Sequence, residues 1–411
     1  MRASRSSSST RRGGPDRLPD SARVTPFNEA RLDDPEVRSR IDRFDMLRAL
    51  ATAGAQARLG WRLADEAGIE RLTAGERPRS VHIAALGASE TVADIASSLV
   101  SRSGAVLVTT GGSGPLPGWV GPLDLVVAVS LTGRAEGPLA QAHEAARRGA
   151  AVLTVGRPDT ALAEASARAR GVHVPVGEEL RRSRTALWAL TVPVLAGLAA
   201  AEVIDVTADL TEAVADRLDD QAEACRPDAE HFVNPAKTLA HDLAAVVPTV
   251  LGDGLVTGVA ARRAAAMISR TARIPAASGR LPDDASRLIA CLEGPWTEAA
   301  SVASDGGRDI FADPYLDAPS TPPLGVLLLR DPLPDPVTPD DATRHDVAQS
   351  VYDHAQRCGA SVREVVAEPG PDLVRLAGLI ALTDLASTYL SIGFGIDPAT
   401  APGLRDLHEG A

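Results

Sequence analysis

Two hydroxyl side chains and a glycine stand where an apolar strand is expected to pass into a helix. Residues 123–130, LDLVVAVS, form the strand, and Ser130, Thr132 and Gly133 lie at its end. A helix N-terminus has free backbone N–H groups and a partial positive charge, and nearby hydroxyls add donors that can turn toward an anion. The segment is therefore a candidate phosphate site. Serine and threonine are also common N-caps, so a purely structural capping role is the alternative.

Strands and helices alternate around this segment through the first half of the chain. Residues 80–100 read as a strand, a turn of small residues and a helix, and the turn contains Gly87, Ala88 and Ser89. Further strands are predicted at 105–112, 123–130, 150–156 and 171–177, and a long helix at 184–204. Strands rich in Val and Ala with no polar face are typical of a parallel sheet that is covered on both sides. Ligands of such sheets bind beyond the carboxyl ends of the strands.

The second half of the chain repeats this plan. Strands are predicted at 247–254, 286–294, 324–331 and 360–368, helices at 234–244, 256–272 and 371–396, and an exposed loop at 298–323. A length of 411 residues suits two domains. We therefore expect a disordered tail at 1–26, a domain at 27–206, a linker at 207–233 and a second domain at 234–411. An arginine-mediated contact with an acidic partner is the alternative role for the tail.

Composition excludes several classes of protein. Apolar residues make up 45% of the chain and charged residues 23%, as in soluble globular proteins. The net charge of -12 repels phosphate backbones, so no nucleic-acid partner is expected. Long apolar runs such as 186–201 are too short to span a bilayer or are broken, here by Pro193 and Gly197, so no membrane segment is expected.

Cysteine and histidine spacing predicts no metal site and no cofactor. The three cysteines are far apart with no CxxC pair, which fits a reducing cytoplasm, and the eight histidines form no HxH or HExxH pair. The N-terminal residues lack the apolar stretch of a secretory signal. GxGxxG, Walker and GxSxG patterns are likewise missing from the sequence.

The two small-residue segments resemble those of sugar isomerase (SIS) domains. LGASETVAD (86–94) is similar to the Gly-Gly-Ser turn of that family, and SLTGRAEG (130–137) to its Ser-x-Ser-Gly-x-Thr-Glu loop. Residues 27–409 resemble the double-SIS bifunctional glucose-6-phosphate/mannose-6-phosphate isomerases in their actinobacterial form, through stretches such as NPAKTLA, GVAARR, LLLRDP and LTDLASTYLSIGFGIDP. The resemblance implies two three-layer α/β/α sandwiches, each with a mainly five-stranded parallel sheet, and a homodimer.

The resemblance also implies a pocket for a hexose phosphate. Its phosphate-binding residues would be Gly87, Ala88, Ser89, Ser130, Thr132 and Arg184. Arg184 matches an arginine that faces the charge of the ligand, although an exposed arginine at a helix start is the alternative. Two positions depart from the family pattern, because Ala88 replaces a glycine and Ala135 a threonine.

The catalytic positions of the family are changed in this chain. The family's Asn-Glu-Asn-Ala-Lys segment falls on 269–273, so Arg270 stands in place of the carboxylate, and a guanidinium cannot accept a proton near neutrality. The family's histidine segment falls on 282–287, so Ser286 replaces the imidazole. A lysine near the C-terminus falls on His408.

These changes predict a protein that binds a sugar phosphate with weakened or lost turnover. Arg270 would make the pocket more positive, unless it points away from it. The alternative is an active aldose-ketose isomerase that converts glucose 6-phosphate or mannose 6-phosphate to fructose 6-phosphate. Such an enzyme would need a relocated carboxylate, and Asp283, Asp284 and Glu293 lie on or near the same loop.

Overall fold

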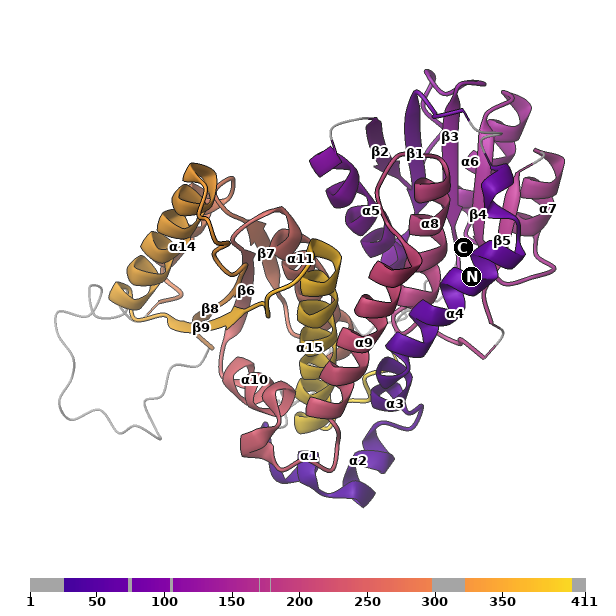
Figure 1. Cartoon of the computed structure of the whole chain (residues 1–411). Helices are drawn as coiled ribbons and strands as arrows, with labels where there is room; N and C mark the ends of the chain where they lie inside the picture. The colour runs from indigo at the N-terminus through magenta and orange to yellow at the C-terminus, as the bar shows by residue number, and fades with distance from the viewer. Residues whose placement is uncertain are drawn as a thin grey trace, which may run out of the picture.

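Two parallel sheets organise the chain (Figure 1). The computed structural model describes residues 26–72, 76–103, 106–169, 171–177, 179–297 and 322–400. The first sheet has the order β2-β1-β3-β4-β5 and contains β1 (Ser80–Ala85), β2 (Leu107–Gly111), β3 (Asp124–Val129), β4 (Ala151–Gly156) and β5 (Val172–Pro175). The second has the order β7-β6-β8-β9 and contains β6 (Val247–Gly252), β7 (Ala277–Arg280), β8 (Leu324–Arg330) and β9 (Ser361–Val366).

The strand order confirms that the second half repeats the first, but the second sheet has four strands and not five. The strand predicted at 286–294 is wrong, because this segment contains helix α12 (Ala285–Leu292). Leu288 and Leu292 are buried one helical turn apart, so the apolar spacing is that of a helix. The edge strand β7 has the sequence ASGR, which carries no apolar alternation to predict it.

Helices cover both faces of each sheet. An inner layer lies between the two sheets (Figure 1) and contains α4 (Ala53–Glu66), α5 (Glu90–Ser103), α8 (Leu187–Ala200), α9 (Ala208–Ala224), α11 (Leu255–Thr271) and α15 (Asp372–Gly393). The outer face of the first sheet packs on α6 (Glu136–Arg147) and α7 (Ala161–Arg168), and that of the second on α12 and α14 (Pro339–Arg357).

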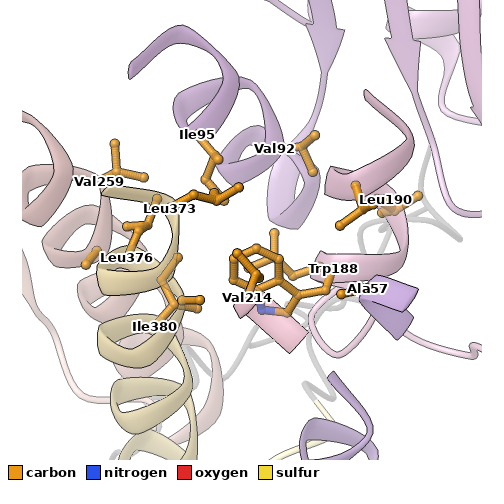
Figure 2. Close-up of a cluster of buried hydrophobic side chains, with 14 of the residues drawn as sticks. Ala57, Val92, Ile95, Trp188, Leu190, Val214, Val259, Leu373, Leu376 and Ile380 are labelled. Carbon is orange, nitrogen blue, oxygen red and sulfur yellow. The ribbon is translucent and has the colours of Figure 1, made fainter. Parts of the chain in front are cut away.

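The inner layer is one continuous apolar core. Figure 2 shows side chains of α4, α5, α8, α9, α11 and α15 in contact around Trp188, which is 3% exposed. Val92 and Ile95 come from the first domain, and Leu376 and Ile380 from the second. Burial of aliphatic side chains from both domains in one cluster fixes how the two sheets sit relative to each other.

Segments outside the two sandwiches also pack against them. The N-terminal helices α1 (Ala30–Asp33), α2 (Pro35–Ile41) and α3 (Met46–Ala51) precede α4, and α1 packs against α15 of the second domain. The region expected as a linker, 207–233, contains α9, whose Val214 and Leu218 are buried in the core. The predicted tail and most of the predicted loop at 298–323 lie outside the described residues.

Helix α15 is the one described helix that is long and apolar enough to cross a membrane. In its apolar window, 78% of the residues are buried inside the protein. It packs against α10 (Pro235–Ala244), α11 and α9, which is how the core helix of a soluble protein behaves.

Candidate functional site

The first sheet has a topological switch point between β1 and β3. The chain passes from β1 to β2 on one side and then crosses to β3 on the other side of β1. In the register of the two strands, Ala85 at the end of β1 pairs with Val129 at the end of β3. The turn at Gly87 and the loop at Ser130 therefore leave the sheet side by side, at the place where open α/β sheets bind their ligands.

The turn after β1 is a short 3-10 helix, Gly87–Ser89, that leads into α5. Gly87 has φ of +62°, and a Cβ added there would meet no atom within 4 Å, so this side of the turn is open. Its N–H donates to Oε1 of Glu90 at 3.2 Å. Ser89 is 3% exposed and Ala88 is half-buried. The N–H of Ser89 donates to the carbonyl of Leu86, so the turn presents its open glycine face, with the Gly87 N–H held by Glu90, rather than long side chains.

The loop after β3 holds the two hydroxyls without capping the helix that follows. Ser130 is buried, and its Oγ accepts from the N–H of Ala135 at 3.4 Å. Thr132 is exposed, and its Oγ1 accepts from the N–H of Arg134 at 3.4 Å. Helix α6 begins at Glu136, and its N-cap, Ala135, gives no side-chain hydrogen bond. No side chain caps α6, so the amides of Glu136 and Gly137 can meet an anion, whereas Pro138 has no N–H. Both hydroxyls accept from loop amides, that of Ser130 from the N-cap residue Ala135, so a purely structural role stays the alternative.

Arg270 lies in the last turn of α11 and faces the same region. It is half-buried, and burial lowers the pKa of its guanidinium, with a further contribution from Arg263. The carboxylate of Glu90, which accepts from the N–H of Gly87, raises the pKa of Arg270 and so offsets part of this effect. Arg270 and Glu90 are therefore close enough to interact electrostatically beside the turn. Sequence reasoning missed Glu90, because an acidic residue in the first turn of a helix is expected from the helix dipole alone.

The guanidinium of Arg184 donates to backbone carbonyls and does not point into an open pocket. Its Nη1 donates to the carbonyls of Arg270 and Pro398 and its Nη2 to that of Ala399, each at 3.0 Å. Burial, followed by repulsion from Arg182 and other arginines, lowers the pKa of Arg184 to about 10. The side chain therefore holds the end of α11 against residues 398–399. Its predicted contact with a phosphate stays a prediction, since both terminal nitrogens already have partners.

Ser286, the second of the catalytic positions, does not join Arg270 within one chain. Ser286 is exposed in the first turn of α12, which follows β7. The side chain of Arg280, at the end of β7, packs on Gly258 near the start of α11. Gly258 and Arg270 are twelve residues apart on α11, a rise of about 18 Å. Ser286 and Arg270 thus lie toward opposite ends of α11. His408 lies outside the described residues.

The proposed replacement carboxylates line or adjoin a separate cleft. This cleft has a volume of about 810 Å³ and lies between α5, α11, β7 and α12. Asp283 pairs with Arg280, and Asp284 pairs with Arg287 at 2.9 Å. The N–H of Arg280 donates to Asp284, which lowers the pKa of that carboxyl.

Glu293 is also engaged away from the turn, where it pairs with His354 at 3.4 Å. The 810 Å³ cleft begins at Asp94, one turn along α5 from Glu90. Asp283 and Asp284 are thus ion-paired toward the far end of α11 from Arg270, and Glu293 is paired with His354. Glu90 is the acidic side chain that binds the Gly87 turn.

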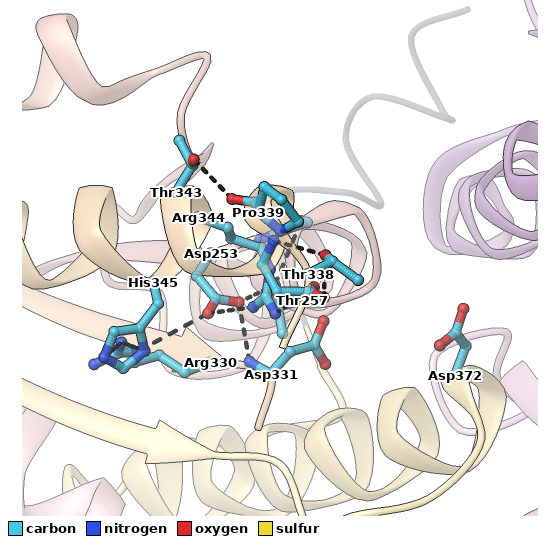
Figure 3. Close-up of polar contacts among 12 residues, drawn as sticks. Asp253, Thr257, Arg330, Asp331, Thr338, Pro339, Thr343, Arg344, His345 and Asp372 are labelled. Atoms are coloured by element: carbon cyan, nitrogen blue, oxygen red, sulfur yellow. Dashed lines mark hydrogen bonds and ion pairs between the residues drawn. The ribbon is translucent and has the colours of Figure 1, made fainter. Parts of the chain in front are cut away.

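The equivalent switch point of the second sheet, between β6 and β8, is filled by ion pairs (Figure 3). Asp253, which follows β6, is fully buried and pairs with Arg344 at 2.8 Å. Its other oxygen accepts from the N–H of Asp331 at 2.9 Å and from Thr257 at 3.0 Å. Burial raises the pKa of Asp253 despite these contacts. A carboxylate of the protein thus occupies the position where the first domain presents open donors.

The C-terminal half of the chain matches a known family. Residues 232–410 match the family described as the bacterial phospho-glucose isomerase C-terminal SIS domain. No curated protein matches the sequence. The family match and the two parallel sheets confirm the predicted SIS fold.

Solved structures agree with this fold at low sequence identity. A hypothetical protein from Thermus thermophilus is 14% identical over 93% of this chain and 92% of its own, with a TM-score of 0.64. The C-terminal domain of glucosamine-fructose-6-phosphate aminotransferase from Francisella tularensis is 10% identical over 86% and 98%, with a TM-score of 0.59. A glucose-6-phosphate isomerase like protein from Thermus thermophilus is 18% identical over 92% and 99%, with a TM-score of 0.50.

Proposed function

We propose that the protein binds a hexose phosphate at the switch point of its first sheet, because residues 232–410 match the bacterial phospho-glucose isomerase C-terminal SIS domain family. The phosphate would lie between the turn at Gly87 and the loop at Ser130 and Thr132. The sugar would extend toward Glu90 and Arg270. Turnover would be weak or lost, because the usual proton-transfer groups are replaced.

One observation carries the binding proposal. Helix α6 begins without a side-chain cap, and two hydroxyls and an open glycine turn surround its N-terminus. Free N–H groups at a helix start attract an anion, and hydroxyls can rotate to donate to it. The second switch point supports the assignment by contrast, because Asp253 already takes its donors there.

Charge around the site favours an anionic ligand. The half-buried Arg270 is always protonated near neutral pH and lies beside the turn. Glu90 offsets part of that charge, so a phosphate bound at the turn would replace Glu90 as the acceptor of the Gly87 N–H. Arg184 supports this arrangement indirectly, because it fixes the backbone at Arg270.

The same residues argue against efficient isomerisation. Moving a proton between C1 and C2 of an aldose requires a base, and Arg270 cannot accept a proton. Ser286, in the first turn of α12, lies away from Arg270, and its hydroxyl is no proton shuttle near neutral pH. Loss of one general base lowers a rate by about 10²- to 10⁴-fold.

Binding is tested by ligand-induced stabilisation. Fructose 6-phosphate at a hundred times its Kd would raise the free energy of unfolding by about 2.7 kcal/mol. Ser130→Ala with Thr132→Ala removes most of this gain if the phosphate binds there. Thr343→Ala with Ser350→Ala, on the exposed face of α14, is the matched control and keeps it. An equal gain in both double variants would contradict the site.

A second candidate function rests on Glu90. Its carboxylate contacts the Gly87 turn, so an active isomerase could use Glu90 as its base in place of the family carboxylate. Loss of deuterium from C2-labelled glucose 6-phosphate distinguishes the two functions. Exchange well above background that disappears in Glu90→Gln supports the enzyme, whereas no exchange by a protein that binds the sugar phosphate supports the binding protein.

A further inference from the structure

Two histidines and a glutamate from separate segments converge beside the second domain. Glu29 directly precedes α1, His231 begins the 3-10 helix His231–Val233, and His241 lies on α10. One ligand atom of each residue lies within 4.8 Å of the others. Nδ1 of His241 is 2.5 Å from Oε1 of Glu29, and the two imidazole rings have centroids 5.7 Å apart. The three side chains thus point toward one another.

A hydrogen-bonded pair explains only part of this cluster. Glu29 and His241 satisfy each other, but Nδ1 of His231 is buried and has no hydrogen-bond partner among the described residues. Buried polar atoms in folded proteins are normally satisfied. The unpartnered nitrogen belongs to a ring that lies beside a second imidazole and a carboxylate, so the cluster has ligand capacity that the hydrogen bond between Glu29 and His241 does not use.

The backbone around the cluster is well fixed. The carbonyl of His231 accepts from the N–H of Asn234, and the side chain of Asn234 caps α10 by accepting from the N–H of Ala236 and Lys237. Nζ of Lys237 is buried and binds Asp33 of α1 at 2.7 Å. These contacts hold the segment that carries Glu29 against the segment that carries the two histidines. The backbone therefore keeps the three side chains near one another.

We propose that Glu29, His231 and His241 form a binding site for a transition-metal ion of the Zn²⁺ class. Two imidazoles and one carboxylate are donors that suit Zn²⁺ and its neighbours rather than Mg²⁺ or Ca²⁺, which prefer oxygen ligands alone. Bonds of about 2.0–2.2 Å in a tetrahedral site place the ligand atoms about 3.4 Å apart, so Nδ1 of His241 and Oε1 of Glu29 must separate while the wider contacts close. The side chains of Glu29 and His241 are 48% and 51% exposed, so they can rotate to do this. Their exposure also leaves a fourth position open to water.

Metal binding would fasten the N-terminal segment to the second domain. Glu29 comes from the start of the chain, whereas both histidines lie more than 200 residues later. Figure 1 places α1 next to α10, and Lys237 joins the two helices. A metal at this position would add a second fixed point, so its effect would be on stability and not on the sugar-phosphate site near Gly87.

The test is titration of the full, untagged chain with ZnCl₂ by isothermal calorimetry after dialysis against a chelator. We expect one Zn²⁺ bound per chain and a higher melting temperature with Zn²⁺. His231→Gln and His241→Gln each weaken binding at least tenfold, since even second-shell changes lower metal affinity by about 10- to 100-fold. His354→Gln is the matched control, because His354 contacts Glu293 and Cys358 and not the three proposed ligands, and it leaves binding unchanged.

Glu29→Gln separates a folding defect from loss of a ligand, because Glu29 is half-exposed and its amide keeps the size of the side chain. Its melting temperature without Zn²⁺ stays at the wild-type value, and its Zn²⁺ affinity falls. Absence of saturable Zn²⁺ binding by the wild-type chain would overturn the proposal, as would wild-type affinity in both Glu29→Gln and His241→Gln.

Discussion

Replacing Gly87 by alanine tests the phosphate turn with little disturbance of the fold. Gly87 has φ of +62°, and nothing lies within 4 Å of an added Cβ, so the methyl group meets no steric clash. The left-handed conformation itself costs an L residue about 1–2 kcal/mol. Domains are commonly stable by about 5–15 kcal/mol, so Gly87→Ala still folds.

The effect on the ligand is larger than the effect on stability. The new methyl group would stand on the open side of the turn, next to the N–H groups that are proposed to bind phosphate. At fructose 6-phosphate of a hundred times the wild-type Kd, the wild type gains about 2.7 kcal/mol. A variant that binds a hundred times more weakly gains only about 0.4 kcal/mol under the same conditions.

Chemical unfolding with and without fructose 6-phosphate measures both quantities. Gly149→Ala is the matched control, because Gly149 also has a positive φ, +76°, and an added Cβ would meet only Pro122 at 3.7 Å. It follows the end of α6, away from the switch point, so its variant loses similar stability and keeps the full ligand gain. If Gly87→Ala keeps that gain too, the phosphate does not bind at this turn.

Two further predictions concern the buried polar contacts. Asp253→Asn removes the buried carboxylate that pairs with Arg344 and lowers the free energy of unfolding by about 3 kcal/mol. Asp228→Asn, at a side chain that is 84% exposed, changes it by less than about 1 kcal/mol in the same urea titration. Burial lowers the pKa of His82 below its ordinary 6.5, so stability is full above pH 6.5 and falls as the pH drops through the lower folded value. His82→Gln makes the urea midpoint less dependent on pH between 7.5 and 5, and an unchanged dependence would refute the assignment.

The sequence predicts most strands of this fold because they are buried on both faces. β3, DLVVAV, is buried at every position, and such an apolar run needs no tertiary information to be recognised. α12 was expected as a strand because ASRLIACL is a short apolar run in which helix and strand are hard to tell apart. β6 is the one described strand that pairs with β7, and the local sequence ASGR does not predict this pairing.

The site is predictable where strand order alone decides it. Gly87 and Ser130 follow β1 and β3, and any parallel sheet that pairs these strands brings the two segments together. Two of the three backbone carbonyls that Arg184 binds are more than 200 residues away, which no spacing rule reveals. The same limit hides the Glu29 and His241 pair, since the histidine motifs searched in a sequence are local.

The two switch points show how one plan serves two purposes. At the start of α11, the second domain places the carboxylate of Asp253 among the donors that a bound anion would otherwise use, and Arg344 neutralises it. At the other end of the same helix, Arg270 faces the open switch point of the first domain. The carboxylate of Asp253 fixes the start of α11, and because α11 is one rigid helix, this also fixes the position of Arg270 in its last turn. On this argument the second sandwich stabilises the site, and the first sandwich binds the ligand.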